Sequence, residues 1–375
     1  MNEKTNAIGQ EIATLSSRRE FLFLYDIKMG NPNGDPDENR PRVLPDGTFY
    51  VTDVRLKRFI RDYLKTQKYT CDGKQCNYDI LVDTVEGKTT NLTGRVAEYL
   101  KSKGLKECEG KDLVNILLDA FIDARLFGSS FAFKAKERED EDGDAQPEEE
   151  AVKNEAAAPD KKAKGKGKSK EAKWEPKPEP KTLTGPVQIH HGEVLHQAQE
   201  VDIHGTCIFG SQEEKKQGTF TSSFILRYAL IGFSGVANEH SAKRSRLADS
   251  DYDVYLKAMW QSVRAAANTR TKAGQQPIFL VNVVYKPGVE FQYGRLTDYV
   301  KLVAATGKPQ KEWASPADYL VDIAILAQRL DVQRDKIAQI HYCVSPDLQL
   351  VTPMPQGWHN LALDGPIADI PPAKG

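Results

Sequence analysis

A long charged segment in the middle of the chain limits how its 375 residues can fold. Residues 137–150 read EREDEDGDAQPEEE, residues 161–170 read KKAKGKGKSK, and three prolines lie between Lys173 and Lys181. This composition offers too little apolar surface to offset the entropy lost on ordering. We therefore predict that residues 135–181 form a disordered insertion. Its basic tract is either a solvated linker or a flexible arm that contacts nucleic-acid backbone.

The bulk composition excludes several classes of protein. The formal net charge is -1, so global charge favours neither a nucleic-acid nor a membrane partner. The five cysteines are odd in number and scattered, unlike the framework of a disulfide-rich secreted protein. The first twenty residues lack the apolar run of a signal peptide, and no stretch approaches the roughly 18 apolar residues of a membrane span. We expect a cytoplasmic protein without a membrane partner.

On either side of the charged segment, the patterns predict strands and helices without a regular alternation, which is typical of an α+β fold. We also expect a loop-rich stretch over residues 184–204 and an irregular tail from residue 353. The expected strands span residues 21–29, 217–238 (as a strand or a hairpin) and 277–285. The expected helices span residues 50–64, 94–103, 111–125 and 318–330, with another that begins at the N-cap Ser250 and buries Tyr252, Tyr255, Leu256, Met259, Trp260 and Val263.

The helix expected over residues 50–64 carries unbalanced charge. Thr52 or Asp53 is its expected N-cap, and one face is apolar. The run from Arg55 to Arg61 contains four bases and no acid. Exposed helices usually intersperse acids with bases at helical spacing. The pattern therefore favours a surface for phosphates over an ordinary solvated face. We call this set the basic ridge; it comprises Arg55, Lys57, Arg58 and Arg61.

The loop before this helix reads NPNGDPDENRPRV over residues 31–43. Its three prolines restrict the backbone, while its asparagines and glycine suit turns. A stiff loop loses little entropy when it contacts RNA or a neighbouring protein. We expect it to hold Arg40 and Arg42 near the basic ridge.

The sequence contains four motifs in order: NPNGDPDENRPRVL, FYVTDVRLKRFIRDYL, DARLFG at residues 123–128 and LTGPVQI at residues 183–189. Together they resemble the Cas-seven family of CRISPR-associated proteins, and more narrowly its Csh-two and Csd-two subgroup of type I-B and I-C systems, with I-B favoured. The charged insertion departs from the family pattern.

The resemblance implies a palm related to the RNA-recognition motif (ferredoxin-like), a helical finger and a loop-like thumb. Residues 18–134 would hold the first part of the palm and the finger. Residues 182–352 would hold the thumb and the rest of the palm, and residues 353–375 the tail. Copies would polymerise along the spacer of one guide RNA (crRNA) as the backbone of the Cascade complex. The guide would then pair with target DNA.

Such a protein must hold any guide sequence, so it should bind phosphates and 2′-hydroxyls rather than base edges. The partners implied are crRNA, target DNA through the guide, further copies of the chain, and the repeat-handle-binding, large and small Cascade subunits. Candidates for a thumb wedge between bases are Ile203, Ile208 and Phe209. The RNA-binding candidates are Arg40, Arg42, Arg55, Lys57, Arg58, Arg61, Lys243, Arg244, Arg246, Arg264, Arg270 and Lys272.

Metal binding is a weaker hypothesis. Asp35 and Asp37 do not meet the calcium-loop template. The histidines at positions 190, 191, 196 and 204, with Cys207, lack paired metal-ligand spacing, as does the Cys71–Cys76 pair. We assign no metal and no cofactor.

The rival function is a magnesium-dependent endoribonuclease like the type III backbone subunits, with Asp26, Asp35 or Asp37 as its catalytic aspartate. A structural, RNA-free filament is a further alternative. No nucleotide-binding or hydrolase motif is present, so we expect a protein that is not an enzyme.

Overall fold

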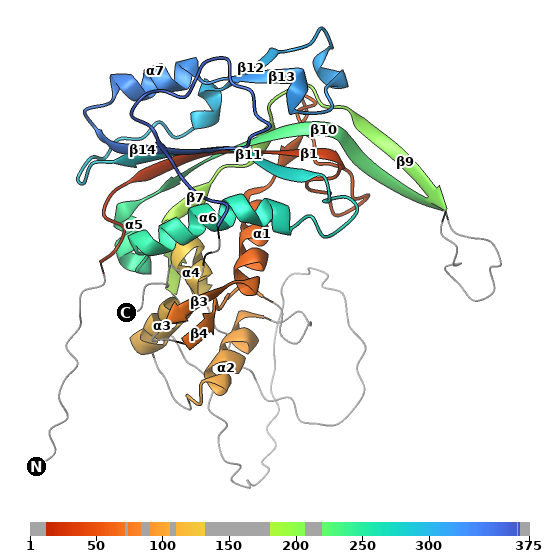
Figure 1. The fold of residues 1–375 in the computed structure, drawn as a ribbon. Helices are drawn as coiled ribbons and strands as arrows, with labels where there is room; N and C mark the ends of the chain where they lie inside the picture. The colour runs from red at the N-terminus through yellow and green to blue at the C-terminus, as the bar shows by residue number, and fades with distance from the viewer. Residues whose placement is uncertain are drawn as a thin grey trace, which may run out of the picture.

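The computed structural model describes residues 13–71, 74–83, 91–105, 110–131, 181–206, 220–365 and 367. Within them, one sheet of nine strands forms the centre of the molecule (Figure 1). Its strands are β1 (Arg19–Gly30), β2 (Tyr50–Val51), β7 (Val187–Ile189), β8 (Gly192–Val194), β9 (Glu200–Thr206), β10 (Phe220–Ala237), β11 (Gln275–Tyr285), β14 (Ile337–Val344) and β15 (His359–Asn360). The strand order is β15-β14-β11-β1-β10-β8-β2, and β7 and β9 also pair with β10.

The central strand β1 is buried on both faces of the sheet. It pairs antiparallel with β10 on one side and with β11 on the other. Phe21, Phe23 and Tyr25 point into one core, and Leu22 and Leu24 point into another, as the two-residue period of a strand requires. This explains why the sequence of β1 is continuously apolar rather than alternating.

Two helices cover one face of the sheet, and a smaller layer covers the other (Figure 1). The first layer consists of α1 (Asp53–Thr66) and α6 (Asp249–Ala265), preceded by the short helix α5 (Glu239–Ser245). The second layer contains β12 (Lys301–Ala304), β13 (Tyr319–Asp322), α7 (Ala324–Val332) and the 3-10 helices η1 (Leu296–Tyr299), η2 (Gln310–Glu312) and η3 (Pro316–Asp318). Helix α6 connects β10 to β11 across β1. No described helix combines the length and the apolar character needed to cross a membrane.

A third, smaller core lies below α1 and α6 in Figure 1. Its elements are α2 (Leu92–Ser102), α3 (Gly110–Ala120), α4 (Ile122–Phe127) and the hairpin of β5 (Gly128–Phe131) with β6 (Lys181–Thr184). A second hairpin, β3 (Lys68–Cys71) with β4 (Lys74–Asn77), lies beside it (Figure 1), and its Tyr69 packs against the larger core under the sheet. Phe131 pairs with Lys181, so two described residues that are fifty positions apart in the sequence lie side by side at the end of a hairpin. Of the predicted insertion, residues 135–180 lie outside the described residues, whereas Lys181 belongs to β6.

The DARLFG and LTGPVQI motifs hold this core to the sheet layer. Gly128 has a φ of 78°, and Gly185 packs so closely that an added Cβ would lie 2.1 Å from the carbonyl carbon of Phe127. Arg125 donates two 2.8 Å bonds to Asp251 at the start of α6, and both side chains are buried. The glycines allow the backbones to approach, and the ion pair joins α4 to α6.

Most predicted elements are confirmed, and the differences have physical reasons. Residues 50–51 form a strand rather than the start of a helix, because Tyr50 pairs with Glu193. The helix predicted over 111–125 breaks at Phe121, whose extended backbone separates α3 from α4. Residues 319–322 alternate buried and half-buried side chains as strand β13, so the helix predicted from 318 begins at Ala324.

Three further predictions are corrected or refined. The N-cap of α6 is Ala248, whose N–H is bonded by the Asp251 carboxylate, rather than Ser250. The stretch expected to be loop-rich contains β7, β8 and most of β9, and the tail contains the two-residue strand β15. The segment 217–238, predicted as a strand or a hairpin, holds the single long strand β10 from Phe220 onward. The six apolar residues predicted as the buried stripe of α6 are all buried.

Candidate nucleic-acid interface

The loop of residues 31–43 joins three parts of the fold. Asn31 donates its backbone N–H to Thr271 at 3.0 Å and its side-chain amide to the Asn39 carbonyl at 2.6 Å. The Asn33 side chain accepts the backbone N–H of Thr52 at 2.9 Å and the Thr52 hydroxyl at 2.8 Å. Because Thr52 is the N-cap of α1, the loop fixes where that helix begins relative to the end of β1.

The two loop arginines lie in different surroundings: Arg42 is beside the start of α1, whereas the contacts of Arg40 are with β9, β10 and its own loop. The main-chain carbonyl of Arg42 accepts the N–H of Tyr50, two residues before the N-cap of α1. The Arg42 side chain is half-buried, and its Nε has no partner among the described residues. Arg40 stacks on the Phe224 ring, 3.6 Å from its centroid, and pairs with Glu38 and Glu200.

The basic ridge is divided between two environments, and acids neutralise much of it. Lys57 pairs with Asp53 at 2.9 Å and is only 16% exposed. Arg58 pairs with Asp62 at 2.7 Å but remains 49% exposed. The interpretation of an unbalanced helix face is therefore wrong for these side chains. The run from Arg55 to Arg61 stops just short of Asp53 and Asp62, and each of these acids lies one helical turn from the base that it neutralises.

Arg61 is tied to the DARLFG motif. Its side chain is 12% exposed and donates to Asp123 at 2.9 Å, while Asp123 is 1% exposed. The cations of Lys57 and Arg61 both lie over the ring of Phe127. The part of the ridge that was expected to face phosphates thus packs on α4. The pairing of Arg61 with Asp123 had no local signal, because 62 residues separate the two.

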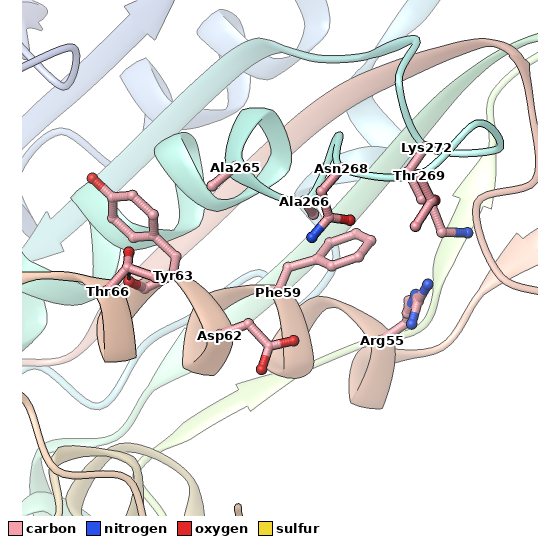
Figure 2. A pocket seen from close by; sticks show the side chains of 10 residues that line it. All are labelled: Arg55, Phe59, Asp62, Tyr63, Thr66, Ala265, Ala266, Asn268, Thr269 and Lys272. Atoms are coloured by element: carbon pink, nitrogen blue, oxygen red, sulfur yellow. Dashed lines mark hydrogen bonds between the residues drawn. The ribbon is translucent and has the colours of Figure 1, made fainter. Parts of the chain in front are cut away.

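The remaining ridge residue, Arg55, faces a cavity of about 220 Å³ between α1 and the segment that follows α6 (Figure 2). Lys272 lies at the same end of the cavity as Arg55 (Figure 2), and its ammonium donates to the main-chain carbonyl of Asn31. Arg55 and Lys272 are two RNA-binding candidates that the fold brings together from distant parts of the sequence. The cavity lining is Arg55, Phe59, Asp62, Tyr63, Thr66, Ala265, Ala266, Asn268, Thr269 and Lys272.

Sequence reasoning missed Asn268 and Thr269, which bring polar side chains to this cavity. The available signal was the run NTRTK directly after the α6 pattern, because a polar, basic loop at a helix end can present donors to an anion. In the same loop, exposed Arg270 donates to the Ser223 hydroxyl at 2.5 Å. Arg264 pairs with Asp364, also at 2.5 Å.

The fold does not bring Lys243, Arg244 and Arg246 to this cavity. They lie on or beside α5, before α6 begins, whereas the cavity lies after α6 ends. A helix of 17 residues spans about 25 Å. Lys243 and Arg244 are exposed, and Arg246 pairs with Asp119 at 2.7 Å.

One of the thumb-wedge candidates, Ile203, lies on an arm of the sheet. Strand β9 and the paired half of β10 extend away from the body of the sheet (Figure 1). Ile203 lies half-buried on β9 opposite Ser223. Ile208, Phe209 and Cys207 lie outside the described residues.

The histidines of residues 190–204 have separate environments. His196 is buried, its Nε2 accepts the N–H of Leu230, and burial lowers its pKa to about 4. His191 accepts the N–H of Asp53, and His204 contacts the Ser222 hydroxyl. In the described parts of the chain, no three potential metal ligands cluster.

The three aspartates of the nuclease hypothesis also have different environments. Asp26 is buried, Tyr228 donates to it at 3.0 Å, and burial raises its pKa to about 7. Asp35 accepts the backbone N–H groups of Glu38 and Arg40, as the side chain of a turn does. Asp37 is exposed.

The family model of CRISPR-associated protein Cas7 matches residues 17–324. The chain belongs to the Cas7 family. The match begins just before β1 and ends at the start of α7, so it includes the loop, α1, the arm and the cavity. The CRISPR-associated protein Cas7 of Haloferax volcanii is 27% identical over 346 residues, which cover 90% of this chain and 89% of the relative.

Two solved structures resemble the Cas7-family chain more distantly. A chain of "CRISPR RNA-guided surveillance complex, pre-nicking" is 12% identical, with a TM-score of 0.48 over 92% of this chain and 96% of that chain. A chain of "CRISPR RNA-guided surveillance complex" is 11% identical, with a TM-score of 0.43 over 91% and 94%.

Proposed function

We propose that this Cas7-family protein is the guide-RNA-binding backbone subunit of a type I Cascade complex, of subtype I-B rather than I-C. Copies assemble along the crRNA spacer and present it for pairing with target DNA. The observation that carries the proposal is the family match over residues 17–324, which includes every element of the candidate interface.

The strand order supports an RNA-recognition-motif-like palm. Strand β1 is followed by α1, the edge strands β7 to β9, then β10, α6 and β11, with β1 between β10 and β11. This order supports the split β-α-β arrangement of a ferredoxin-like fold, which we propose for the palm. The helices α2 to α4 correspond to the finger, and the β9–β10 arm corresponds to the thumb.

The arm suits a contact between successive copies along the guide. Such head-to-tail contacts use different surfaces on each partner, so they generate an open row rather than a closed ring. Many weak contacts along one RNA then add by avidity. The row would meet the repeat-handle-binding subunit at one end and the large and small subunits alongside.

The nuclease alternative receives little support from the aspartates. Asp26 is 5% exposed and accepts a hydrogen bond from the Tyr228 hydroxyl, which leaves it little access to RNA. A hydrolytic site needs a reactive group within hydrogen-bond reach of its substrate. We therefore propose that the protein binds its RNA and does not cleave it, and that target cleavage belongs to another component.

A charge reversal on the interface tests the proposal. Arg58→Glu with Arg270→Glu changes two exposed side chains, neither of which holds a buried carboxylate. Arg334→Glu with Lys311→Glu makes the same charge change in exposed residues of the opposite layer. If each interface arginine neutralises one phosphate, their loss should flatten the log–log salt slope for single-stranded RNA by about 1.4. The control pair should keep the parent slope.

Co-expression with a guide provides the second readout. The parent protein should purify with RNA as a series of RNA-dependent oligomers, measured by absorbance ratio and particle mass. An RNA-free monomer that degrades added RNA when magnesium is present would contradict the proposal and favour the nuclease.

A further inference from the structure

The cavity beside α1 contains two cations that no carboxylate bonds. Among the described residues, neither Arg55 nor Lys272 has an ion-pair partner. Lys272 is 7% exposed and donates to the main-chain carbonyl of Asn31. The Nε of Arg55 is buried without a hydrogen-bond acceptor. The one acid in the lining, Asp62, is bonded to Arg58.

The positive charges of Arg55 and Lys272 therefore lack a compensating negative charge in the described part of the chain. A buried cation is costly unless an opposite charge or several acceptors compensate for the lost water. Here two cations approach each other, and burial followed by the charge of Arg55 lowers the pKa of Lys272 to about 7. Burial likewise lowers the pKa of Arg55. An anion held between them would remove the repulsion and accept their free N–H groups.

The size and lining of the cavity select the kind of anion. Its volume of about 220 Å³ is below the 300–1,000 Å³ typical of small-molecule pockets, so it suits one charged group rather than a whole nucleotide. The Arg55 guanidinium supplies a planar set of donors that matches phosphate oxygens. Asn268 and Thr269 add an amide and a hydroxyl at the rim.

We propose that this cavity binds one phosphodiester group of the guide RNA between Arg55 and Lys272. A phosphate held there stabilises the ammonium form of Lys272, so binding is accompanied by uptake of a proton on that residue. This inference rests on the proposed function and adds to it a specific phosphate subsite with a pH dependence. The proton comes from solvent and remains on the lysine amine, so no covalent bond changes.

The charged groups around Lys272 determine the direction of the effect. Arg55 on α1 faces it, and Arg55 is in turn influenced by Tyr25 on β1 and by Asp62 and Arg58 on α1. A bound phosphate favours the ammonium form. RNA affinity should therefore fall as pH rises through about 7, by about tenfold one pH unit above that value.

The test measures anisotropy of a labelled single-stranded oligoribonucleotide at fixed ionic strength, one pH unit below and one above neutrality. The parent protein should lose about tenfold more affinity across this range than Lys272→Gln. The matched control is Lys286→Gln, because Lys286 also donates to a main-chain carbonyl but is exposed at the other end of β11. It should retain the parent pH profile.

A second variant keeps the test decisive if Lys272→Gln does not fold. Arg55→Gln removes the neighbouring cation, so the lysine should gain its proton more easily and the pH midpoint should move upward, while Arg55→Lys should keep the parent midpoint. Inorganic phosphate, compared with chloride at equal ionic strength, should raise the melting temperature of the RNA-free parent and leave that of Lys272→Gln unchanged.

The outcomes separate this inference from the proposed function. If the parent binds RNA and Lys272→Gln shows the same pH profile, the subsite is wrong and the RNA-binding function stands. If inorganic phosphate stabilises the parent but the RNA affinity is the same in all variants, the cavity is an anion site that the guide does not use, which also overturns the inference. If the parent binds no RNA, both fail.

Discussion

Arg58 and Arg61 are nearly adjacent on α1, yet their loss should have different consequences. Arg58 forms an exposed pair with Asp62, whereas Arg61 donates to an aspartate that is 1% exposed. Asp123 also accepts the backbone N–H groups of Leu81 at 2.7 Å and Val82 at 3.2 Å. We predict that Arg61→Ala destabilises the fold and that Arg58→Ala leaves stability nearly unchanged.

The magnitudes follow from burial. Removal of one partner from a buried ion pair costs about 3–5 kcal/mol, because the other charge stays unpaired. Asp123 would retain its two main-chain donors, so we expect about 2–3 kcal/mol for Arg61→Ala. Exposed pairs contribute about 0.2–1 kcal/mol, so Arg58→Ala should lower the free energy of unfolding by about 0.5 kcal/mol.

Urea denaturation of RNA-free protein at one ionic strength measures both values. A double-mutant cycle with Asp123→Asn isolates the contribution of the ion pair. In the Asp123→Asn background, Arg61→Ala leaves no unpaired carboxylate at position 123, so it should cost at least about 1 kcal/mol less than in the parent protein. Equal losses for Arg58→Ala and Arg61→Ala, or no coupling in the cycle, would refute the assignment of Arg61 to the fold. The result also affects the interpretation of RNA-binding measurements on variants. A charge reversal at Arg61 would weaken RNA retention because it unfolds the protein, not because it removes a contact with RNA.

Two other predictions concern stability. Burial raises the pKa of Asp26 to about 7. The folded state is therefore most stable while this carboxyl is protonated, and the stability that it contributes is lost as pH rises toward and through 7. Asp26→Asn should flatten that pH dependence and raise the free energy of unfolding at pH 8 by up to about 4 kcal/mol. Parallel urea profiles for the two proteins would contradict this. Gly185→Ala should cost about 3 kcal/mol, because the new Cβ would meet the backbone of Phe127 and Gly128. Gly307→Ala, where nothing lies within 4 Å, should be neutral. Similar losses in the two variants would show that the close approach is not a constraint.

The features that the sequence predicted well are those encoded by local periodicity. The apolar stripe of α6 and the continuously apolar β1 both follow from residues a few positions apart. Where an element depends on a distant partner, the prediction was wrong. Tyr50 is a strand residue because of Glu193, and the helix predicted from residue 318 begins only at Ala324 because β12 pairs with the residues between.

The sequence names the cations of the candidate site but does not indicate their arrangement. Lys57 and Arg61 were grouped with Arg55 because all three lie in one acid-free run, in which Lys57 and Arg61 have helical spacing. The spacing carries no information on Asp123 or Phe127, which occupy that side of α1 in the fold. Conversely, Arg55 and Lys272 are more than two hundred residues apart, so only the packing of α1 against the end of α6 shows that they share a cavity.

The basic side chains of this region therefore form two groups: those that are already paired with a carboxylate and those that are not. Arg61 and Arg125 are paired with buried aspartates and hold α4 to α1 and α6. Arg55 and Lys272 are partly or largely buried without such a partner, so their charge remains available to a ligand. The stiff loop of residues 31–43 connects the two halves of that second set. Asn33 fixes the start of α1, and Asn31 bonds both Thr271 and Lys272. A loop restricted by three prolines can hold this separation with little entropic cost, which gives a structural reason for a rigid polar segment between an apolar strand and a basic helix.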